Sequence, residues 1–159
     1  MTEPCPLCGA PLGGRNGCHA LFHEHGALAW QRPGWGATHN LLVDAYAMQH
    51  PEEYGLSVKS YAQHLVALGC GVEHASDAAL YWNISRWIGS EGAPVKPALL
   101  ESRGDVTIQS VPIDATDDEH RTQVQAWAAA VWEAYRPQHD LARRSLDQVR
   151  AWAAAQKRT

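Results

Sequence analysis

Hydrophobic residues recur at helical spacing over most of the chain beyond residue 37. The segment 38–50 is apolar on nearly every side, which is typical of a buried helix, and Pro51 is expected to end it. A second helix is predicted over 57–69, where one apolar stripe follows Ser57, a favourable N-cap residue. Its expected end is one of two glycines, Gly69 or Gly71.

Three further helices are predicted in the rest of the chain. One covers about 76–89, and the next opens on a capping box formed by Thr116 and Glu119 and ends near Pro137. The last runs over 138–156. The pattern therefore predicts a mainly α fold, built as a compact helical domain. The tryptophans on these helices are expected to lie in the core: Trp82, Trp87, Trp127, Trp132 and Trp152.

The segment 90–115 is predicted to be a loop that contains one strand-like stretch. Residues 106–111 alternate between the two faces of an extended chain, which favours a short strand. A single strand needs a partner, and the cysteine-rich N-terminal segment is the candidate. The sequence therefore predicts at most a short β pair in an otherwise helical protein.

The first 36 residues differ from the rest of the chain. They hold three of the four cysteines together with many proline and glycine residues, so a long helix is not expected at the start. A short helix is predicted over 18–30. The length of 159 residues predicts a single domain over 1–159. Within it, we expect 1–36 to form a cysteine-rich zinc head and 37–159 to form a helical body.

Composition and charge exclude several classes of protein. Hydrophobic residues make up 45% of the chain, which is enough to build a core and argues against disorder. The formal net charge of −4 makes a nucleic-acid partner unlikely, because acidic surfaces repel phosphate. No apolar run approaches the roughly 18 residues that a membrane span needs. The N-terminus lacks the features of a signal peptide, so a cytoplasmic location with reduced thiols is expected.

The strongest chemical signal is a pair of cysteines, Cys5 and Cys8, followed by Gly9. Two thiolates at this spacing can hold one metal ion from a tight turn, as in a zinc knuckle. Cys18 is the natural third ligand, and a thiolate-rich set favours zinc. The fourth ligand stays open among four histidines: His19, His23, His25 and His39. Of these, His23 has the spacing of a helix-borne pair with Cys18.

Two other interpretations of the cysteines remain open. A redox Cys-x-x-Cys motif normally begins a helix after a strand, and only four residues precede Cys5. Unliganded surface thiols are the second alternative. A proline-rich turn rather than a helix follows Cys5, and zinc is the favoured cofactor because it is typical of thiolate-rich sites.

A second group of candidate residues lies farther along the chain. Asp44 is surrounded by apolar residues within the 38–50 helix, and a buried carboxylate needs a partner. If the first two long helices form a hairpin, His50 and His64 can join Asp44 in a metal site or an acid–base cluster. The alternative is a buried network of hydrogen bonds with no ion. His39 and His50 lie about 16 Å apart along the helix, too far to share an ion. The remaining candidates are expected to pack in the core: Cys70, His120 and His139.

These motifs resemble a family of short bacterial proteins classed as a domain of unknown function. The resemblance rests on the motif C-x-x-C-G, a third cysteine and the signature H-x-x-x-V-D-A-Y-x-x-Q-H-P, and it spans most of the chain. The matching residues are Cys5, Cys8, Gly9, Cys18, His39, Val43, Asp44, Ala45, Tyr46, Gln49, His50, Pro51, Ser57 or Ser60, His64, Leu65, Leu68, Trp127, Trp132 and His139. It implies a helical protein with a metal-binding head and no assigned activity. The family pattern has an aromatic residue after the third cysteine, where this chain has His19.

Two functions of different classes follow from these residues. In the first, zinc is structural and the protein is a binding or adaptor module for a protein or small-molecule partner, with a homodimer as one expected assembly. An exposed apolar patch near Trp35 or Trp152 would serve this role. In the second, the protein is a metal-dependent enzyme, a hydrolase or a thiol transferase acting on a small molecule. Its catalytic candidates are Asp44, His50 and His64.

Overall fold

The computed structural model describes residues 2–74, 77–90 and 95–158, and every regular element within them is helical. The helices are α1 (Gly14–Gln31), α2 (Pro33–Gly36), α3 (His39–Gln49), α4 (Pro51–Tyr54), α5 (Val58–Glu73), α6 (Ala78–Ser90), α7 (Asp117–Ala134) and α8 (His139–Gln156), with 3-10 turns at Ile108–Ser110 (η1) and Arg136–Gln138 (η2). The predicted mainly helical fold is confirmed. None of the helices in these ranges combines the length and the apolar character needed to cross a bilayer.

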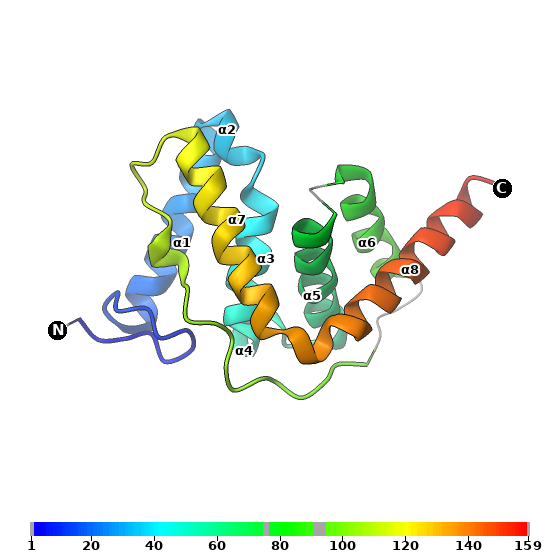
Figure 1. Cartoon of the computed structure of the whole chain (residues 1–159), viewed down its shortest axis with the longest axis horizontal. Coiled ribbons are helices and arrows are strands. Elements are labelled where there is room, and N and C mark those ends of the chain that lie inside the picture. The colour runs from blue at the N-terminus through cyan, green and yellow to red at the C-terminus, as the bar shows by residue number, and fades with distance from the viewer. Residues whose placement is uncertain (1, 75–76, 91–94, 159) are drawn as a thin grey trace.

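The helices gather in two groups, which Figure 1 shows side by side. One group contains α1, α3 and α7 and has the N-terminal segment beside it, whereas the other contains α5, α6 and α8. Helix α5 joins the groups because its two faces belong to different hydrophobic clusters. Leu65 and Leu68 pack with α3 and α7, and Val66 and Cys70 pack with α6 and α8. Cys5 and Cys18 lie in the first cluster, so the head shares the core of the helical body.

The predicted N-caps of α5 and α7 are confirmed. The Ser57 side chain accepts a hydrogen bond from the Ser60 N–H over 3.0 Å, at the start of α5. The Thr116 N–H donates to the Glu119 carboxylate over 2.8 Å, which completes the predicted capping box of α7. Between α7 and α8, the chain passes through a 3-10 turn that contains Pro137. Residue 76, where the third helix was expected to begin, lies outside the described residues, and α6 is described from Ala78.

The expected end of the second helix at Gly69 or Gly71 is wrong, because α5 continues to Glu73. Both glycines serve close packing between helices. A Cβ atom at Gly69 would come within 2.7 Å of the Trp132 ring, and one at Gly71 would come within 2.8 Å of Leu41. The missing side chains therefore let α5 approach its neighbours.

The predicted strand over 106–111 is also wrong, and the described residues contain no strand. Ile108 begins a 3-10 turn instead, and both Ile108 and Val111 are buried. The backbone before this turn is held by the Gln49 side chain, which donates to the carbonyl groups of Arg103 over 3.1 Å and Val106 over 2.8 Å. The segment satisfies its polar groups in this way without a strand partner.

Helix α1 begins earlier than the predicted 18–30 helix. Gly13 and Gly14 take φ angles of 84° and 73°, which lead the chain from the N-terminal turn into the helix. A Cβ atom at Gly17 would overlap the carbonyl oxygen of Leu12, so glycine is required for the turn to lie against α1. The glycine-rich sequence thus shapes the approach to a long helix rather than preventing one.

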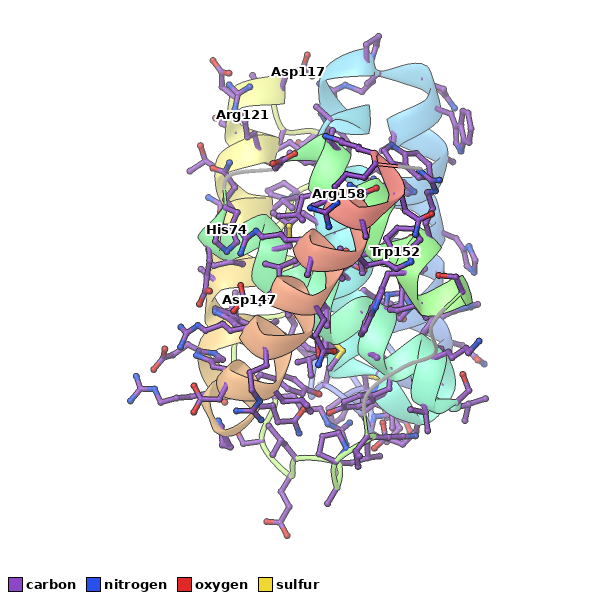
Figure 2. All side chains as sticks on the ribbon, turned by 90° about the vertical axis from the view of Figure 1, so that its right-hand side faces the viewer. His74, Asp117, Arg121, Asp147, Trp152 and Arg158 are labelled. Carbon is purple, nitrogen blue, oxygen red and sulfur yellow. The ribbon has the colours of Figure 1, made fainter. Side chains whose placement is uncertain are left out.

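The tryptophans only partly follow the expectation that all five lie in the core. Three of them are buried: Trp87, Trp127 and Trp132. Trp82 is 65% exposed, so its assignment to the core is wrong. Trp152 is half-buried on α8 next to α6 (Figure 2), where the Arg86 guanidinium lies 5.7 Å from the centre of its ring.

Trp35, which was expected near an exposed patch, is fully buried. Its ring stacks on His120 of α7 with 3.7 Å between the ring centres. Asp117, at the start of α7 (Figure 2), forms an ion pair with Arg32 at the end of α1 over 3.2 Å. Together these contacts hold the short helix α2 against α7, which covers Trp35.

Candidate metal centre

The first two cysteines belong to a tight turn at the N-terminus. The Gly9 N–H donates to the Cys5 carbonyl over 2.8 Å, and the Cys5 N–H donates to the Ala10 carbonyl over 2.8 Å. Gly9 has a φ angle of 79°, which glycine adopts without a Cβ penalty. The turn folds the chain back so that Cys5 and Cys8 approach the same point.

The other two members of the cluster come from separate helices. Cys18 lies on α1, and His50 directly follows the last residue of α3. Pro51 then begins α4, and a proline at this position disfavours helical geometry in the residue before it. His50 accordingly has φ −128° and ψ 47°, outside the helical region. This break between α3 and α4 places the imidazole against Cys5 and Cys18.

The four ligand atoms have the spacing of a tetrahedral metal site. The Sγ atoms of Cys8 and Cys18 are 3.7 Å apart, and His50 Nε2 lies 3.4 Å from Cys18 Sγ. His50 Nε2 lies 3.7 Å from Cys5 Sγ, and all four atoms lie within 4.8 Å of one another. Zinc–sulfur bonds of about 2.3 Å and zinc–nitrogen bonds of about 2.0 Å put tetrahedral neighbours roughly 3.5–3.8 Å apart. These residues therefore fit a metal ion bound by three sulfurs and one nitrogen.

The imidazole of His50 is held in the orientation that metal binding requires. Its Nδ1–H donates to the Tyr46 carbonyl one helical turn earlier, over 2.7 Å. This bond assigns the proton to Nδ1 and leaves the lone pair of Nε2 facing the sulfur atoms. A backbone carbonyl is a common second partner of metal-binding histidines.

Electrostatics favour a thiolate at Cys18. The hydrogen bond from the Cys8 thiol, followed by the contacts with His50 and Tyr46, lowers the pKa of Cys18 to about 4 even though burial opposes the change. The shared hydrogen bond and burial raise the pKa of Cys8 above its ordinary value. The Tyr46 hydroxyl lies 3.7 Å from Cys18 Sγ, and Arg15 Nη1 donates to that hydroxyl over 3.5 Å. A cation bound here would stabilise the remaining thiols as thiolates.

Aromatic side chains close the site from solvent. The Phe22 ring stacks on Tyr46 with 4.0 Å between the ring centres, and Tyr46 stacks on His50 at the same distance. Cys5, Cys18 and His50 are buried, and Cys8 is half-buried. With four protein ligands and little exposure, the arrangement has the features of a structural metal site.

The amino-acid sequence of the chain matches one protein family. The model of a family of unknown function, DUF5946, matches residues 3–136. The chain belongs to this family. The expected resemblance to a domain of unknown function is thereby confirmed. A search of curated proteins and a search of solved structures each returned no match.

The region that matches DUF5946 includes all four cluster residues and ends between α7 and α8. The centre therefore lies wholly within the family region, whereas α8 lies outside it. The cluster itself joins three segments of that region: the N-terminal turn, α1 and the junction of α3 with α4.

The four histidines that were weighed as the fourth ligand lie outside the cluster, which takes His50 in their place. His19 and His23 are on α1 with their Nε2 atoms 2.9 Å from each other. His25 is buried and hydrogen-bonded to the Val111 carbonyl over 3.1 Å. His39, at the start of α3, is half-buried. Pro51 is the sequence signal that could have identified His50. It breaks the helix at His50 and so turns the chain at this ligand.

The structure does not bring Asp44, His50 and His64 into one group. His64 Nδ1 lies 2.8 Å from Asp44 Oδ1, whereas the His50 ring faces the cysteines. Asp44 is buried, and burial raises its pKa to about 6 although the hydrogen bond with His64 opposes the change. The spacing of six residues between Asp44 and His50 turns their side chains to different sides of α3.

The histidines of the C-terminal half are buried beside aromatic rings, as the alternative core interpretation expected. His120 stacks on Trp35, and its Nδ1 lies 3.2 Å from the Thr38 hydroxyl. His139 stacks on Trp132, and its Nε2 donates to the Trp132 carbonyl over 2.7 Å. Neither histidine belongs to the Cys5–Cys8–Cys18–His50 cluster.

Proposed function

We propose that this protein is a zinc-binding helical module in which the zinc ion is structural and the helical body binds a partner. The observation that carries the proposal is the closed cluster of three cysteines and one histidine, whose ligand atoms lie within 4.8 Å of one another. Thiolate-rich tetrahedral sets favour zinc over the harder divalent ions. A structural site is filled by four protein ligands, whereas a catalytic site keeps one position open.

The placement of the ligands supports a structural role. The N-terminal turn has no helix of its own and carries Cys5 and Cys8, while Cys18 and His50 come from the helical part. An ion at this point ties the turn to α1 and to the end of α3. The head thus gains its order from the ion and from packing against the first hydrophobic cluster.

The enzyme hypothesis receives less support from the same geometry. It required Asp44, His50 and His64 to share one open site, and His50 faces the cysteines instead. The remaining pair of Asp44 and His64 contains no third ligand for a metal ion within the described ranges. A hydrolase or thiol transferase mechanism therefore lacks the metal-bound nucleophile on which that hypothesis depended.

The binding role is supported by an exposed aromatic residue in the head, close in the chain to where the helical body begins. Trp30, in the last turn of α1, is 90% exposed, which is unusual for so large an apolar side chain. We propose a protein or a small molecule as the partner and a cytoplasmic location, with self-association into a homodimer to be tested by light scattering. The net charge of −4 supports a partner other than nucleic acid.

Metal analysis of the full chain tests the zinc assignment. We expect one zinc per chain by elemental mass spectrometry, and a tetrahedral absorption spectrum with sulfur-to-cobalt charge transfer after exchange with Co²⁺. Cys18→Ser should lose the ion. Cys70→Ser is the matched control, because Cys70 is also buried but packs in the second hydrophobic cluster, and it should keep one zinc.

Added ligands separate a structural site from a catalytic one. We expect the Co²⁺ spectrum to stay unchanged when cyanide or imidazole is added, since no coordination position is open. A spectrum that shifts would overturn the structural role in favour of an open site. Absence of metal from wild-type protein, together with a disulfide between Cys5 and Cys8, would overturn the zinc assignment and support the redox interpretation. The wild-type measurements decide these points even if Cys18→Ser does not fold.

A further inference from the structure

A pocket of about 110 Å³ lies between α3, α5 and α6, on the side of the molecule away from the N-terminal turn. Its lining includes Asp44 of α3, Cys70 of α5 and, near the start of α6, Asp77, Tyr81 and Trp82. A volume of this order exceeds what a single water molecule needs and can hold a ligand of about five to eight non-hydrogen atoms. The cavity is distinct from the Cys5–Cys8–Cys18–His50 cluster and shares no residue with it.

Asp44 gives the pocket a buried carboxylate that can accept a further hydrogen bond. The residue is 1% exposed, and its Oδ1 is engaged by His64 Nδ1 at 2.8 Å. Its Oδ2 is also buried and makes no hydrogen bond of good geometry among the residues that the structure describes, although the Tyr81 hydroxyl lies near enough to the carboxylate to lower its pKa. Buried carboxylate oxygens are costly to leave unpaired, so an unsatisfied one beside a cavity indicates a missing donor.

The surroundings of Asp44 are anionic. Asp77 is the second carboxylate of the lining, and its Oδ1 accepts from the Leu80 N–H over 3.0 Å. No lysine or arginine in the described part of the chain forms an ion pair with Asp44 or Asp77. Burial raises the pKa of the Cys70 thiol to about 11, so that this side chain adds no charge at neutral pH.

Aromatic rings complete the lining. Tyr81 and Trp82 lie with their ring centres 6.4 Å apart and their planes nearly perpendicular. Trp82 is 65% exposed although it borders the pocket, so its ring is available to a ligand. Aromatic faces attract cations, and they also cover the apolar part of an organic ligand. A carboxylate within an apolar and aromatic cavity is therefore suited to an organic cation.

We propose that this pocket binds a small organic cation, a primary ammonium group on a short apolar chain, with the Asp44 carboxylate as its counter-ion. The ammonium group supplies the donor that Asp44 Oδ2 lacks, and the chain packs against Tyr81 and Trp82. A metal ion is disfavoured, because the pocket offers no set of three close ligand atoms in the described residues. An anion is disfavoured by the two carboxylates.

Titration with n-butylammonium chloride tests this proposal on the zinc-loaded full chain. The readout is the indole N–H signal of Trp82 in a proton–nitrogen correlation spectrum, assigned through Trp82→Phe. We expect a saturable shift with a dissociation constant in the millimolar range or below. 1-Butanol is the matched neutral probe, with the same number of non-hydrogen atoms, and it should bind at least tenfold more weakly. Equal binding of the two probes, or no saturable shift up to 50 mM amine, would overturn the proposal.

Two variants locate the site. Asp44→Asn keeps the shape of the carboxylate and removes its charge, so we expect at least a tenfold loss of affinity for n-butylammonium. Asp140→Asn is the matched control, because its side chain is 84% exposed on α8, outside the lining of the pocket, and it should bind as the wild type does. Unchanged affinity in Asp44→Asn would overturn the proposal.

A third variant covers the case in which Asp44→Asn is poorly folded. Trp82→Ala removes an exposed ring, and we expect it to weaken n-butylammonium binding several-fold, as followed by calorimetry. Unchanged affinity in Trp82→Ala would contradict the proposed placement of the ligand. The zinc content of all these variants should stay at one per chain, so the result is independent of the metal assignment.

Discussion

Two buried polar sites share helix α3, and they are satisfied in different ways. At the C-terminal end of the helix, His50 joins three cysteines whose sulfur atoms surround one point. Fewer than two turns earlier, Asp44 meets the imidazole of His64 and has the Tyr81 hydroxyl nearby, but its Oδ2 makes no hydrogen bond of good geometry within the described residues. Both sites remove polar groups from water, but only the first offers a complete ligand set.

The pKa values of Cys18 and Asp44 show that a buried group needs several partners before its charged form is favoured. The Cys18 thiolate is favoured by its interactions with three neighbouring groups, Cys8, His50 and Tyr46, and together they outweigh burial and lower its pKa. The Asp44 carboxylate has His64 and the nearby Tyr81 hydroxyl, and these do not outweigh burial, so its pKa is raised. One hydrogen bond of good geometry and one nearby hydroxyl therefore leave this buried acid energetically costly, and such a site is available for a ligand.

Removing the imidazole of His64 should have the largest effect on the second site. His64→Ala leaves the buried Asp44 with its main partner gone, and we expect a loss of about 2–4 kcal/mol in the free energy of unfolding at pH 8. Chemical denaturation measures this change. His74→Ala is the matched control, because His74 is an exposed residue at the end of the same helix.

A double-mutant cycle makes this prediction specific. In an Asp44→Asn background, His64→Ala should cost at least 1 kcal/mol less, since no buried charge is left without a partner. The zinc content should not change in any of these variants. Loss of zinc in His64→Ala would show that the two sites on α3 are not separate.

Neutralising Asp44 should have the next largest effect on the free energy of unfolding, and it should raise that free energy where His64→Ala lowers it. Between pH 4 and 6, the folded protein holds a proton on Asp44 that the unfolded chain has released, so the stability that depends on this group falls as pH rises. The difference between a pKa of 3.8 and one of about 6 amounts to roughly 3 kcal/mol above pH 7. Asp44→Asn removes this cost, and we expect it to be more stable than the wild type by about 1–3 kcal/mol at pH 8.

The pH dependence identifies the cause of that gain. The advantage of Asp44→Asn should shrink to about 1 kcal/mol or less near pH 4.5, because Asp44 is then protonated in the folded wild type. The wild type and Asp44→Asn have the same metal site. The difference between their free energies of unfolding at each pH therefore cancels any effect of zinc loss. An advantage that is constant from pH 4.5 to pH 8 would contradict the assignment to this carboxyl group.

The smallest expected effect is on metal affinity at the Cys5–Cys8–Cys18–His50 cluster. Tyr46→Phe removes the hydroxyl that lies 3.7 Å from Cys18 Sγ but keeps the ring that stacks on His50. We expect zinc affinity to fall about tenfold in a competition with a chelator, because contacts to ligand atoms tune metal affinity. Tyr54→Phe is the control, since Tyr54 also packs on Phe22, while the hydroxyl that lies within hydrogen-bond distance of Cys18 Sγ is that of Tyr46. Equal affinities of the two variants would mean that the hydroxyl does not act on the ligand.

The helices could be predicted from the sequence because their signals are local. Caps such as Ser57 and Thr116 and the break at Pro137 act through residues within one turn. The strand over 106–111 could not be excluded in this way, because its backbone is satisfied by Gln49, more than fifty residues earlier in the chain. The end of α5 was predicted wrongly for the same reason. Gly69 and Gly71 do not end the helix but pack against Trp132 and Leu41 from other helices.

The metal cluster could be predicted only in part. Cys5 and Cys8 are linked by their spacing, and Cys18 follows closely, so the three sulfurs are apparent in the sequence. His50 joins them only through the packing of α1 against α3, which no local pattern records. The Asp44–His64 contact depends in the same way on the packing of α3 against α5.

Cys5 and His50 stand 45 positions apart in the chain, so an ion held by both closes a long loop. Such a closure differs from a covalent cross-link because it opens and closes with the free concentration of the ion. By mass action, each tenfold rise in free zinc above the dissociation constant adds about 1.4 kcal/mol to the free energy of unfolding. If zinc is the ion that binds here, the stability of the folded chain therefore depends on the zinc supply around it.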